Sequence, residues 1–371
     1  MADRRLTRRD LLRDGAAVAA GAAAATAGGG ATNAAESPPD AEPWKKTRSY
    51  NPNMEYRRLG KTGAWVSAVC LGGHWKRINT VIAAKGGINP YAMPGEGDLR
   101  AFHRNRRDVV ARCLEMGINY IDACTGGEVL TYAKALKGKR DKVFLGYSWS
   151  EKESRSAEWR STKKLLQGLD EGLKAAGLEY VDLWRVTMHE RGRRHSDAEV
   201  AAMIRALEKA QKQGKCRFTG FSCHDRPWIR TQIEKYPEQV QVIVTPYTAS
   251  SRELPKDSLF ETVRKHDVGM LGIKPFASNS LFKGDSSPKG PHAAEDDKRA
   301  RLAIRHILGN PALTAPIPGL ITLHQVDNVV QAVRERRKLD RAEKAELKRV
   351  TDEMWANLPE GYEWLKDWRN V

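Results

Sequence analysis

Two polar residues close a short apolar segment in the stretch GINYIDACTGG, residues 117–127. Asp122 directly follows Tyr120 and Ile121, Cys124 comes two residues later, and a pair of glycines stands at 126–127. A carboxylate can hold or transfer a proton, and a thiol can act as a nucleophile or a metal ligand. The stretch therefore predicts a buried strand that ends in catalytic or ligand-binding residues. The alternative is a strand end that is polar but has no function.

Similar polar groups follow the other apolar segments of the chain. They are Gly72, Gly73 and His74; Ser148 and Trp149; His189 and Glu190; Ser222, Cys223, His224 and Asp225; Tyr247; Lys274; and Pro318 and Gly319. If the segments are parallel strands of one barrel, their carboxyl ends form one rim and these groups converge there. Ligands from separate strands could also hold a metal, but no local spacing such as His-x-His supports a metal site.

Eight apolar, β-rich segments alternate with segments of helical period from Met54 onward. The expected strands are 68–73, 119–123, 143–149, 181–188, 218–224, 241–247, 270–277 and 315–320. Because parallel strands need crossover helices, eight such units predict a (β/α)8 TIM barrel. We also expect an N-terminal β-hairpin turned at residues 60–63 and extra C-terminal helices. A doubly wound sheet is the alternative, but CLGGHW after the first strand is not the G-x-G-x-x-G of that fold.

Composition favours a soluble globular protein with a basic surface. The 371 residues carry a formal net charge of +17, and the basic residues are interleaved with acidic ones along expected helices. That pattern favours a solvated surface over a nucleic-acid site, so we expect a small-molecule substrate and no nucleic acid. The 5 cysteines show no Cys-x-x-Cys spacing and give no zinc-ribbon or iron–sulfur signal.

The N-terminal residues resemble a twin-arginine export signal. Arg8 and Arg9 precede two leucines, a weakly apolar Ala/Gly stretch and small residues that suit a signal peptidase. We expect a signal peptide at residues 1–35, a linker at 36–53 and a barrel domain at 54–371. The expected location is periplasmic or extracellular, with the twin-arginine export machinery as a partner and no stable membrane span.

From about Met54 to Glu335, the motifs of the chain resemble those of the aldo/keto reductase family. They are LGKTG with VSAVCLGG, GINYIDACTGGE, YVDLWRVTMH, KCRFTGFSCHD, GMLGIKPFASNSLFKG and IPGLITLHQVDNVVQAV, in family order and at barrel spacing. The resemblance implies a barrel that binds a nicotinamide dinucleotide.

The family catalyses with a Tyr acid, an activating Lys, an Asp and a His, and the resemblance implies a degenerate form of this tetrad. Asp122 matches the Asp, while Ser148 falls on the Lys position and Thr187 on the His position. No Tyr follows Asp122 at the family spacing; Tyr132 could replace it, although core packing is the favoured interpretation. His189, two residues beyond Thr187, is with Asp122 the expected catalytic pair.

The same resemblance implies a set of cofactor-binding residues. Ser222 and Cys223 correspond to the pair that holds the carboxamide of nicotinamide, and Lys274 follows the strand that packs on the cofactor. Gly319 and about Gln325 correspond to the segment that meets the 2′-phosphate of NADP. The implied cofactor is NADP, with NAD as a possibility.

The leading hypothesis is an exported oxidoreductase that transfers hydride between NADP(H) and a small carbonyl, sugar or alcohol. The proton donor would be His189, or a water held by Asp122 and His189. We expect Asp122, Cys124 and His189 to cluster above Ser148, with Cys124 made reactive by its histidine neighbour. The alternatives are a binding or scaffold barrel without redox chemistry and, less favoured, a metal-dependent lyase, isomerase or hydrolase.

Overall fold

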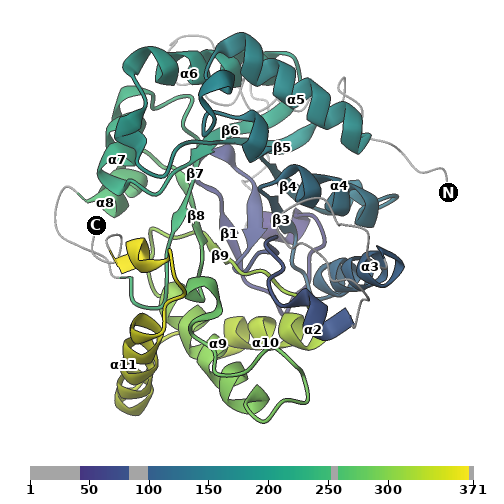
Figure 1. The fold of residues 1–371 in the computed structure, drawn as a ribbon, viewed down its shortest axis with the longest axis vertical. Coiled ribbons are helices and arrows are strands. Elements are labelled where there is room, and N and C mark those ends of the chain that lie inside the picture. The colour runs from purple at the N-terminus through teal and green to yellow at the C-terminus, as the bar shows by residue number, and fades with distance from the viewer. Residues whose placement is uncertain (1–41, 83–98, 252–257, 367–371) are drawn as a thin grey trace, which may run out of the picture.

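The computed structural model describes residues 42–82, 99–251 and 258–366. The expected signal peptide at 1–35 and the first part of the expected linker lie outside the described residues. Within them, seven parallel strands form one sheet in chain order, surrounded by helices (Figure 1). The strands are β3 Tyr120–Ala123, β4 Phe144–Tyr147, β5 Val181–Thr187, β6 Cys216–Ser222, β7 Val242–Pro246, β8 Gly269–Ile273 and β9 Ala315–Ile317.

Residues 70–72 close the barrel between its first and last strands. On one side, the Leu71 N–H donates to Tyr120 O (3.0 Å) and the Leu71 carbonyl accepts from the Asp122 N–H (2.9 Å). On the other side, the Cys70 N–H donates to Pro316 O at 3.0 Å. The first of the expected strands therefore lies between β9 and β3 and supplies the eighth strand position of the barrel, which confirms the (β/α)8 barrel.

A helix follows each strand position, as the alternating sequence pattern predicts. The α-helices are α2 Ile78–Ile82, α3 Leu99–Glu115, α4 Gly126–Ala135, α5 Thr162–Ala176, α6 Asp197–Lys212, α7 Arg226–Lys235, α8 Leu259–Lys265, α9 Ala293–Ile307, α10 Leu323–Arg334 and α11 Arg341–Ala356. Helix α11 lies beyond the eighth unit and is an extra C-terminal helix. Among the described helices, none is long and apolar enough to cross a membrane.

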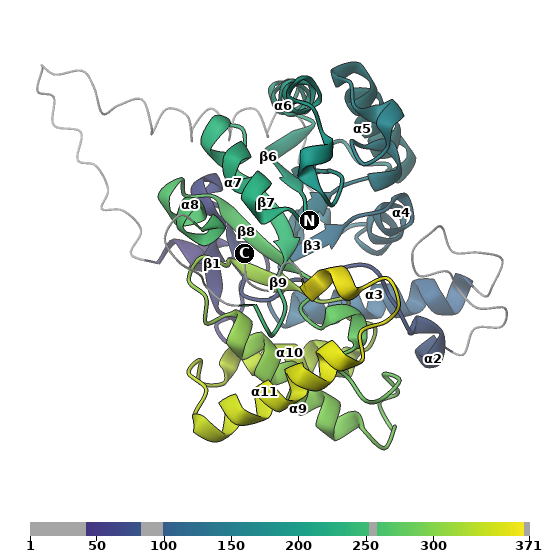
Figure 2. The same cartoon turned by 60° about the vertical axis from the view of Figure 1, so that its left-hand side comes forward.

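Short 3-10 helices complete the loops. They are η1 Pro43–Lys46, η2 Gly60–Thr62, η3 Arg140–Lys142, η4 Ser150–Lys152, η5 Ala157–Trp159, η6 Gly192–Arg194, η7 Ala277–Asn279 and η8 Glu363–Lys366. Figure 2 shows η8, at the C-terminal end of the described chain, beside the ends of β8 and β9.

The N-terminal hairpin closes the lower end of the barrel. Strands β1 Tyr56–Arg58 and β2 Trp65–Ser67 pair antiparallel, and the turn between them ends at Gly63 with a left-handed φ of 69°. Leu59 and Val66 from this hairpin pack into the barrel interior. With the lower end filled by apolar side chains, the opposite end is where a polar site can form.

Side chains inside the barrel change from apolar to polar along β5. Period-two alternation sends every second residue inward, so β5 presents Leu183, Arg185 and Thr187 to the interior. Leu183 belongs to the apolar layer that includes Phe144 and Val242, whereas Arg185 and Thr187 continue toward the carboxyl end. The polar groups of the site therefore rest on a packed apolar layer.

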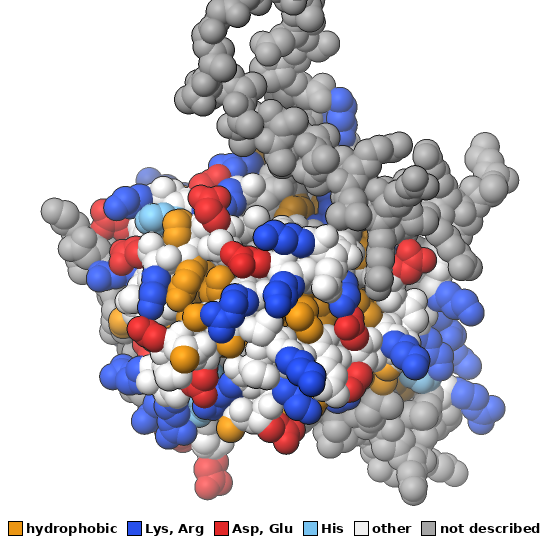
Figure 3. Space-filling model, turned by 90° about the horizontal axis from the view of Figure 1, so that it is seen from above, with side chains coloured by type: hydrophobic (Ala, Val, Ile, Leu, Met, Phe, Trp, Pro, Cys, Tyr) orange, Lys and Arg blue, Asp and Glu red, His pale blue; other side chains and the backbone are white. Residues whose placement is uncertain are grey.

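The outer surface carries the excess of basic charge as dispersed side chains. Figure 3 shows one face on which Lys and Arg are spread among acidic and hydrophobic residues. This distribution agrees with the solvated basic surface expected from the sequence.

Candidate active site

A cavity of about 140 Å³ lies at the carboxyl ends of the barrel strands. Four residues predicted for the site line it: Asp122, Ser222, Lys274 and Gly319. Cys124 also lines it. The rim predicted from strand ends therefore exists, and it gathers a carboxylate, a hydroxyl, a thiol and an ammonium group around one space.

Asp122 is paired with a buried arginine from the strand two positions away. The Arg185 Nε–H donates to Asp122 Oδ1 at 2.9 Å, and Arg185 Nη2 donates to Asp122 Oδ2. Both side chains are almost fully buried, at 2% and 4% exposure. Burial acts to lower the pKa of Arg185, but the Asp122 carboxylate outweighs it and holds that pKa well above its ordinary value. The pair fixes two opposite charges on the floor of the cavity.

Gly146 on β4 gives this ion pair its space. Strand β4 lies between β3 and β5, and Gly146 is the register partner of Asp122. A Cβ atom at Gly146 would lie 2.7 Å from Asp122 Oδ1 and closer still to the Tyr120 hydroxyl. The absence of a side chain therefore lets Asp122 and Arg185 meet across the intervening strand.

A second polar group lies beside the ion pair and is formed by two hydroxyl residues. Ser148 and Thr187 are hydrogen-bonded to each other at 2.7 Å, and Arg185 Nη1 donates to Thr187 Oγ1 at 3.3 Å. Both hydroxyl residues are anchored by the buried Glu153, whose Oε2 accepts from Ser148 Oγ and from the Thr187 N–H (2.7 Å). Ser148 is therefore held below the cavity by neighbouring side chains and does not line it.

Glu128 at the start of α4 holds the opposite wall. Its Oε1 accepts from the His74 N–H (2.5 Å) and meets His74 Nδ1 at 2.6 Å, while its Oε2 accepts from the Cys124 N–H (2.7 Å). Burial acts to raise the pKa of Glu128, but His74 and the backbone donors outweigh burial and hold it below the usual range. Glu128 is thus an ionised anchor that ties two loops of the rim together.

The upper wall of the cavity is cationic and includes a tyrosine from the C-terminal segment. Lys76 Nζ donates to the Tyr362 hydroxyl at 2.9 Å and also to Ser278 Oγ. Lys274 has a left-handed φ of 60°, as has Ser278 in the same loop. A left-handed backbone conformation costs free energy in residues other than glycine, and such residues are concentrated at functional sites.

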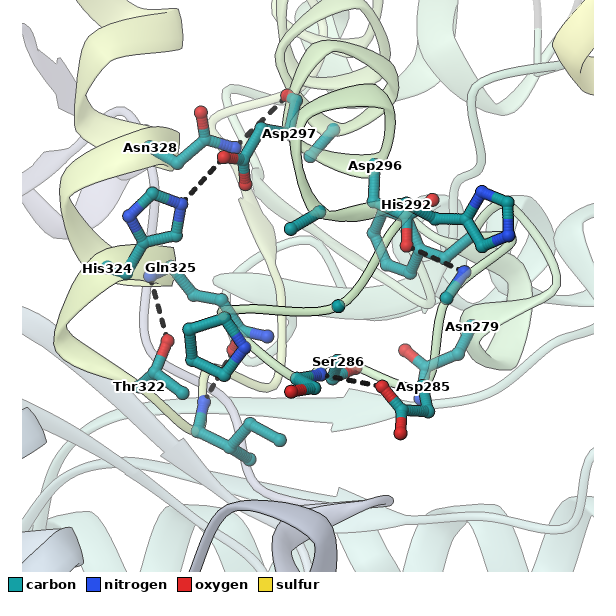
Figure 4. Close-up of a pocket in the computed structure, with 18 of the residues that line it drawn as sticks. Asn279, Asp285, Ser286, His292, Asp296, Asp297, Thr322, His324, Gln325 and Asn328 are labelled. Atoms are coloured by element: carbon teal, nitrogen blue, oxygen red, sulfur yellow. Dashed lines mark hydrogen bonds and ion pairs between the residues drawn. The ribbon is translucent and has the colours of Figure 1, made fainter.

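A second cavity, of about 410 Å³, adjoins the first and is drawn in Figure 4. The first turn of α10 faces it with Thr322, His324 and Gln325. Thr322 caps this helix by accepting the Gln325 N–H at 3.0 Å, and Gln325 Oε1 accepts the Ile321 N–H at 2.8 Å. A helix N-terminus directs its positive dipole end at such a space and favours an anion there.

The acidic side chains of this second cavity are compensated by partners within it. Asp296 accepts from the N–H groups of Lys283 (2.8 Å) and Gly284 (2.9 Å), and Asp297 meets His324 Nε2 at 2.6 Å (Figure 4). The two cavities have Lys76, Phe276, Asn279 and Gly319 in common. They therefore adjoin along these residues, one reaching Asp122 and the other reaching the start of α10.

His189 and Cys223 are not among the residues that line either cavity. His189 Nδ1 accepts the Arg191 N–H at 3.1 Å, and Nε2 lies 3.1 Å from Arg194 Nη1, because its loop folds back over η6. Cys223 is buried and donates its S–H to His189 O at 3.3 Å. The expected cluster of Asp122, Cys124 and His189 is therefore not formed.

Cys124 consequently lacks the histidine neighbour that was expected to activate it. Its sulfur lies 3.8 Å from Arg185 Nη1. Burial raises the pKa of the Cys124 thiol, and the positive charge of Arg185 offsets only part of that effect. The structure therefore corrects the expectation that a histidine activates this thiol.

Sequence reasoning missed Arg185, Glu128 and Tyr362. A charged residue inside the apolar strand segment VDLWRVTM is a signal for an inward-facing ion pair, and Glu128 after two glycines is a weaker one. Tyr362 gives no local signal, because only the fold brings it to the cavity. Among the described residues, no group of three or more His, Cys, Asp or Glu side chains is placed to hold a metal ion.

Comparison with known proteins identifies relatives of this chain. Residues 95–352 match the model of the aldo/keto reductase family. The chain is 26% identical over 310 residues to L-galactose dehydrogenase of Arabidopsis thaliana, covering 77% of this chain and 90% of that protein. It is 24% identical to L-glyceraldehyde 3-phosphate reductase of Escherichia coli (strain K12), over 62% of this chain and 63% of the relative.

Solved structures show the same fold. The holo form of an aldo-keto reductase from Bacillus halodurans matches with a TM-score of 0.58 at 21% identity, covering 83% of this chain and 99% of that one. An aldo/keto reductase from Klebsiella pneumoniae, solved in complex with NADP and acetate, matches with a TM-score of 0.58 at 17% identity, over 80% and 95% of the two chains.

Proposed function

The chain belongs to the aldo/keto reductase family, and from this premise we propose that it transfers hydride between NADP(H) and a small carbonyl, sugar or alcohol. The single observation that carries the proposal is the cleft made of the two adjoining cavities, one over the Asp122–Arg185 floor and the other at the N-terminus of α10. Such a cleft offers an apolar and polar pocket for a reacting group at one end and an anion-binding helix terminus at the other.

The residues along the cleft fit a nicotinamide dinucleotide. Ser222 and Lys274 would hold the nicotinamide end, and the apolar Ile273 and Ile317 line the same pocket. At the other end, the start of α10 with Gly319 and Gln325 would meet phosphate and ribose. When bound, the dinucleotide supplies a hydride to a carbonyl carbon or accepts one from an alcohol. Relatives solved with NADP or NADPH support NADP as the cofactor.

We also propose that the family tetrad is degenerate here and that other residues of this chain take over its work. Ser148 stands where the family has its Lys, and Arg185 takes the place of that Lys as the cationic partner of Asp122. The Thr187 hydroxyl, linked to Ser148 and Arg185, replaces the His. These groups can orient and polarise a bound carbonyl group. None of Ser148, Arg185 and Thr187 is itself an acid suited to donate a proton near neutral pH.

Binding of the dinucleotide is the first test. Purified protein titrated with NADPH should show quenching of tryptophan fluorescence and a rise in melting temperature. Replacing Lys283 by Ala removes a cation from the wall of the second cavity and should weaken NADPH binding about tenfold, the typical worth of a hydrogen bond to a charged group. The matched control, Lys348→Ala on α11, removes an exposed lysine paired with Asp352 and should leave binding unchanged.

A panel of small aldehydes, ketones and aldoses then tests turnover. Absence of binding for both NADPH and NADH at millimolar concentration would refute the proposed oxidoreductase. Binding without turnover across the panel would favour a barrel that binds the dinucleotide but has lost redox chemistry.

Export through the twin-arginine route remains part of the proposal. It is supported by the Arg8-Arg9 pair and by the apolar stretch and small residues that follow it. A fusion of residues 1–53 to a reporter that is active only outside the cytoplasm should be exported in a bacterium with the twin-arginine system. Replacing Arg8 and Arg9 together by Lys should retain the reporter inside, and equal export of both fusions would contradict the assignment.

A further inference from the structure

We propose that Tyr362, which lies beyond α11, donates the proton to the carbonyl oxygen in this site. The inference rests on the proposed function, because a carbonyl needs a proton at oxygen only if it is reduced here. Tyr362 also lies outside the residues matched by the family model, which end at 352. The proposed acid is therefore a feature of this chain's own C-terminal segment.

The position of the phenol is the first argument. Tyr362 lines the same cavity as Asp122, Cys124 and Ser222. Its hydroxyl accepts a hydrogen bond from Lys76 Nζ at 2.9 Å, and the same ammonium group lies 4.2 Å from the centre of the Tyr362 ring. A phenol beside an ammonium group at the mouth of a reaction cavity is an arrangement in which the O–H can leave as a proton.

The segment that carries Tyr362 is fixed to the barrel and does not hang free. Trp364 stacks on His224, with ring centres 4.5 Å apart and planes at 11°, and Leu365 is buried in the core. Lys274 Nζ lies 5.4 Å from the centre of the Trp364 ring. Figure 2 shows the segment beside the ends of β8 and β9, which is where the substrate would enter. The phenol is therefore held in place by packing at neighbouring positions.

The charges around Tyr362 favour its ionised form. Burial by itself would raise the pKa of Tyr362, but the hydrogen bonds from Lys76 and Ser278 and the charges of Lys76 and Lys274 outweigh burial and hold that pKa below its ordinary value. The other titratable groups that face this cluster are Cys124 and Glu190 beside Lys274, and His224 behind Trp364.

The other tyrosines near the floor of the cavity are poorly suited to the role. Tyr132 donates its hydroxyl proton to Gly72 O at 2.5 Å and is fully buried, and Tyr120 donates to Asp122 at 3.3 Å and is equally buried. Burial raises the pKa of both phenols above the ordinary value of tyrosine. Each would hold its proton too tightly to release it to a carbonyl oxygen.

The proton transfer can be written as a balanced step. A bound dinucleotide would supply the hydride, with its electron pair, to the carbonyl carbon, and the electron pair of the C=O π bond would move onto the oxygen and form the new O–H bond with the proton. The Tyr362 O–H bond breaks and its proton goes to that oxygen, which leaves a phenolate stabilised by the Lys76 ammonium group. Lys76 then returns a proton to the phenolate and is itself reprotonated from solvent. In alcohol oxidation the same phenolate accepts the proton.

The first test measures the phenol itself and needs no turnover. Tyrosinate absorbance near 295 nm is recorded between pH 7 and 12 for the wild type and for Tyr362→Phe, and the difference curve isolates one phenol among the 10 tyrosines. The difference should titrate below the ordinary tyrosine pKa of about 10. In Lys76→Met the corresponding difference, taken against Lys76→Met/Tyr362→Phe, should move to higher pH. A Tyr362 that titrates at or above pH 10 in the wild type would overturn the proposal.

The second test separates this inference from the proposed function. Tyr362→Phe should bind NADPH like the wild type but lose about 10²- to 10⁴-fold in kcat, the usual contribution of a general acid. The matched control Tyr236→Phe, in the turn after α7, should retain both binding and kcat. If NADPH binds and substrate turns over equally well in Tyr362→Phe and the wild type, the proton donor is another group while the oxidoreductase stands. If neither protein binds NADPH, the proposed function itself fails.

Discussion

At the scale of single residues, Arg185 compensates the buried negative charge of Asp122. It is the partner of Asp122 and also donates to Thr187, so its removal leaves a carboxylate in the interior without a counter-charge. Removing one member of a buried pair typically costs about 3–5 kcal/mol, more than removing both. We therefore expect Arg185→Met to lower the free energy of unfolding by about 3–5 kcal/mol in urea denaturation followed by tryptophan fluorescence.

The double variant Asp122→Asn/Arg185→Met provides the control for this prediction. Because it removes both charges, it should recover most of the stability that Arg185→Met loses, although it should not recover activity. Losses that simply add up in the double variant would mean that the two charges are not coupled.

At this scale, the sequence could select candidate residues where a strand end carried its own signal. Asp122, Ser222, Lys274 and Gly319 were selected as groups at strand ends, and the structure brings all of them to one cavity. The partner of Asp122 could not be read from its neighbours, because Arg185 lies 63 residues later and meets it only across a third strand. His189 failed to reach the cavity for a related reason, since alternation along a strand says nothing about how the following loop folds.

Strand β4 shows how a structural element creates the space in which those residues meet. A Cβ atom at Gly146 would collide with the Tyr120 hydroxyl and approach Asp122 Oδ1 to 2.7 Å. We expect Gly146→Ala to cost about 1–3 kcal/mol of stability, typical of an overpacked core, and to reduce kcat more than dinucleotide binding. Thermal unfolding and steady-state kinetics measure both effects.

A companion variant identifies the origin of that cost. Tyr120→Phe removes the hydroxyl that the new methyl group would meet first, so Tyr120→Phe/Gly146→Ala should lose less stability than the two single changes together. A Gly146→Ala protein with wild-type stability and activity would show that the strands can separate enough to admit the methyl group.

Elements were more predictable than contacts because their signals are periodic. All eight expected strands coincide with strand positions of the barrel, including residues 70–72, which pair with both neighbours without forming a long ladder. The hairpin turn at residues 60–63 and the extra helix α11 were also predicted correctly. The C-terminal 3-10 helix η8 was not foreseen, because four residues carry too little pattern to predict a docking place on the rim.

Over the whole molecule, charge is arranged differently at the two ends of the barrel. The carboxyl end holds the site, whereas near the amino end Asp182, fully buried at the start of β5, gathers Arg48 (2.8 Å), Arg140 (2.7 Å) and Arg217 (3.4 Å). Through Arg48 it ties the N-terminal segment to the barrel, which marks this cluster as stabilising and separate from the candidate active site.

Asp182 should make the stability of the whole barrel depend on pH in acid. Burial acts to raise the pKa of Asp182, but the three arginines and the Leu145 N–H outweigh burial and lower it far below the ordinary value. A carboxyl group with a lowered folded-state pKa contributes stability that is fully present above its unfolded pKa, about 3.9, and lost as pH falls further.

We expect Asp182→Asn to be less stable than the wild type by about 3–5 kcal/mol at pH 7. The difference should shrink progressively below about pH 4, because there the Asp182 carboxyl group of the unfolded chain takes up a proton that the folded protein does not yet bind. Denaturation curves at several pH values test this prediction. The control is Asp170→Asn, because the Asp170 carboxylate is half exposed and pairs only with Lys215 in the described structure. This substitution should lower the free energy of unfolding by less than about 1 kcal/mol. A gap between wild type and Asp182→Asn that stays constant from pH 7 to pH 2.5 would show that the arginine cluster does not depend on the charge of Asp182.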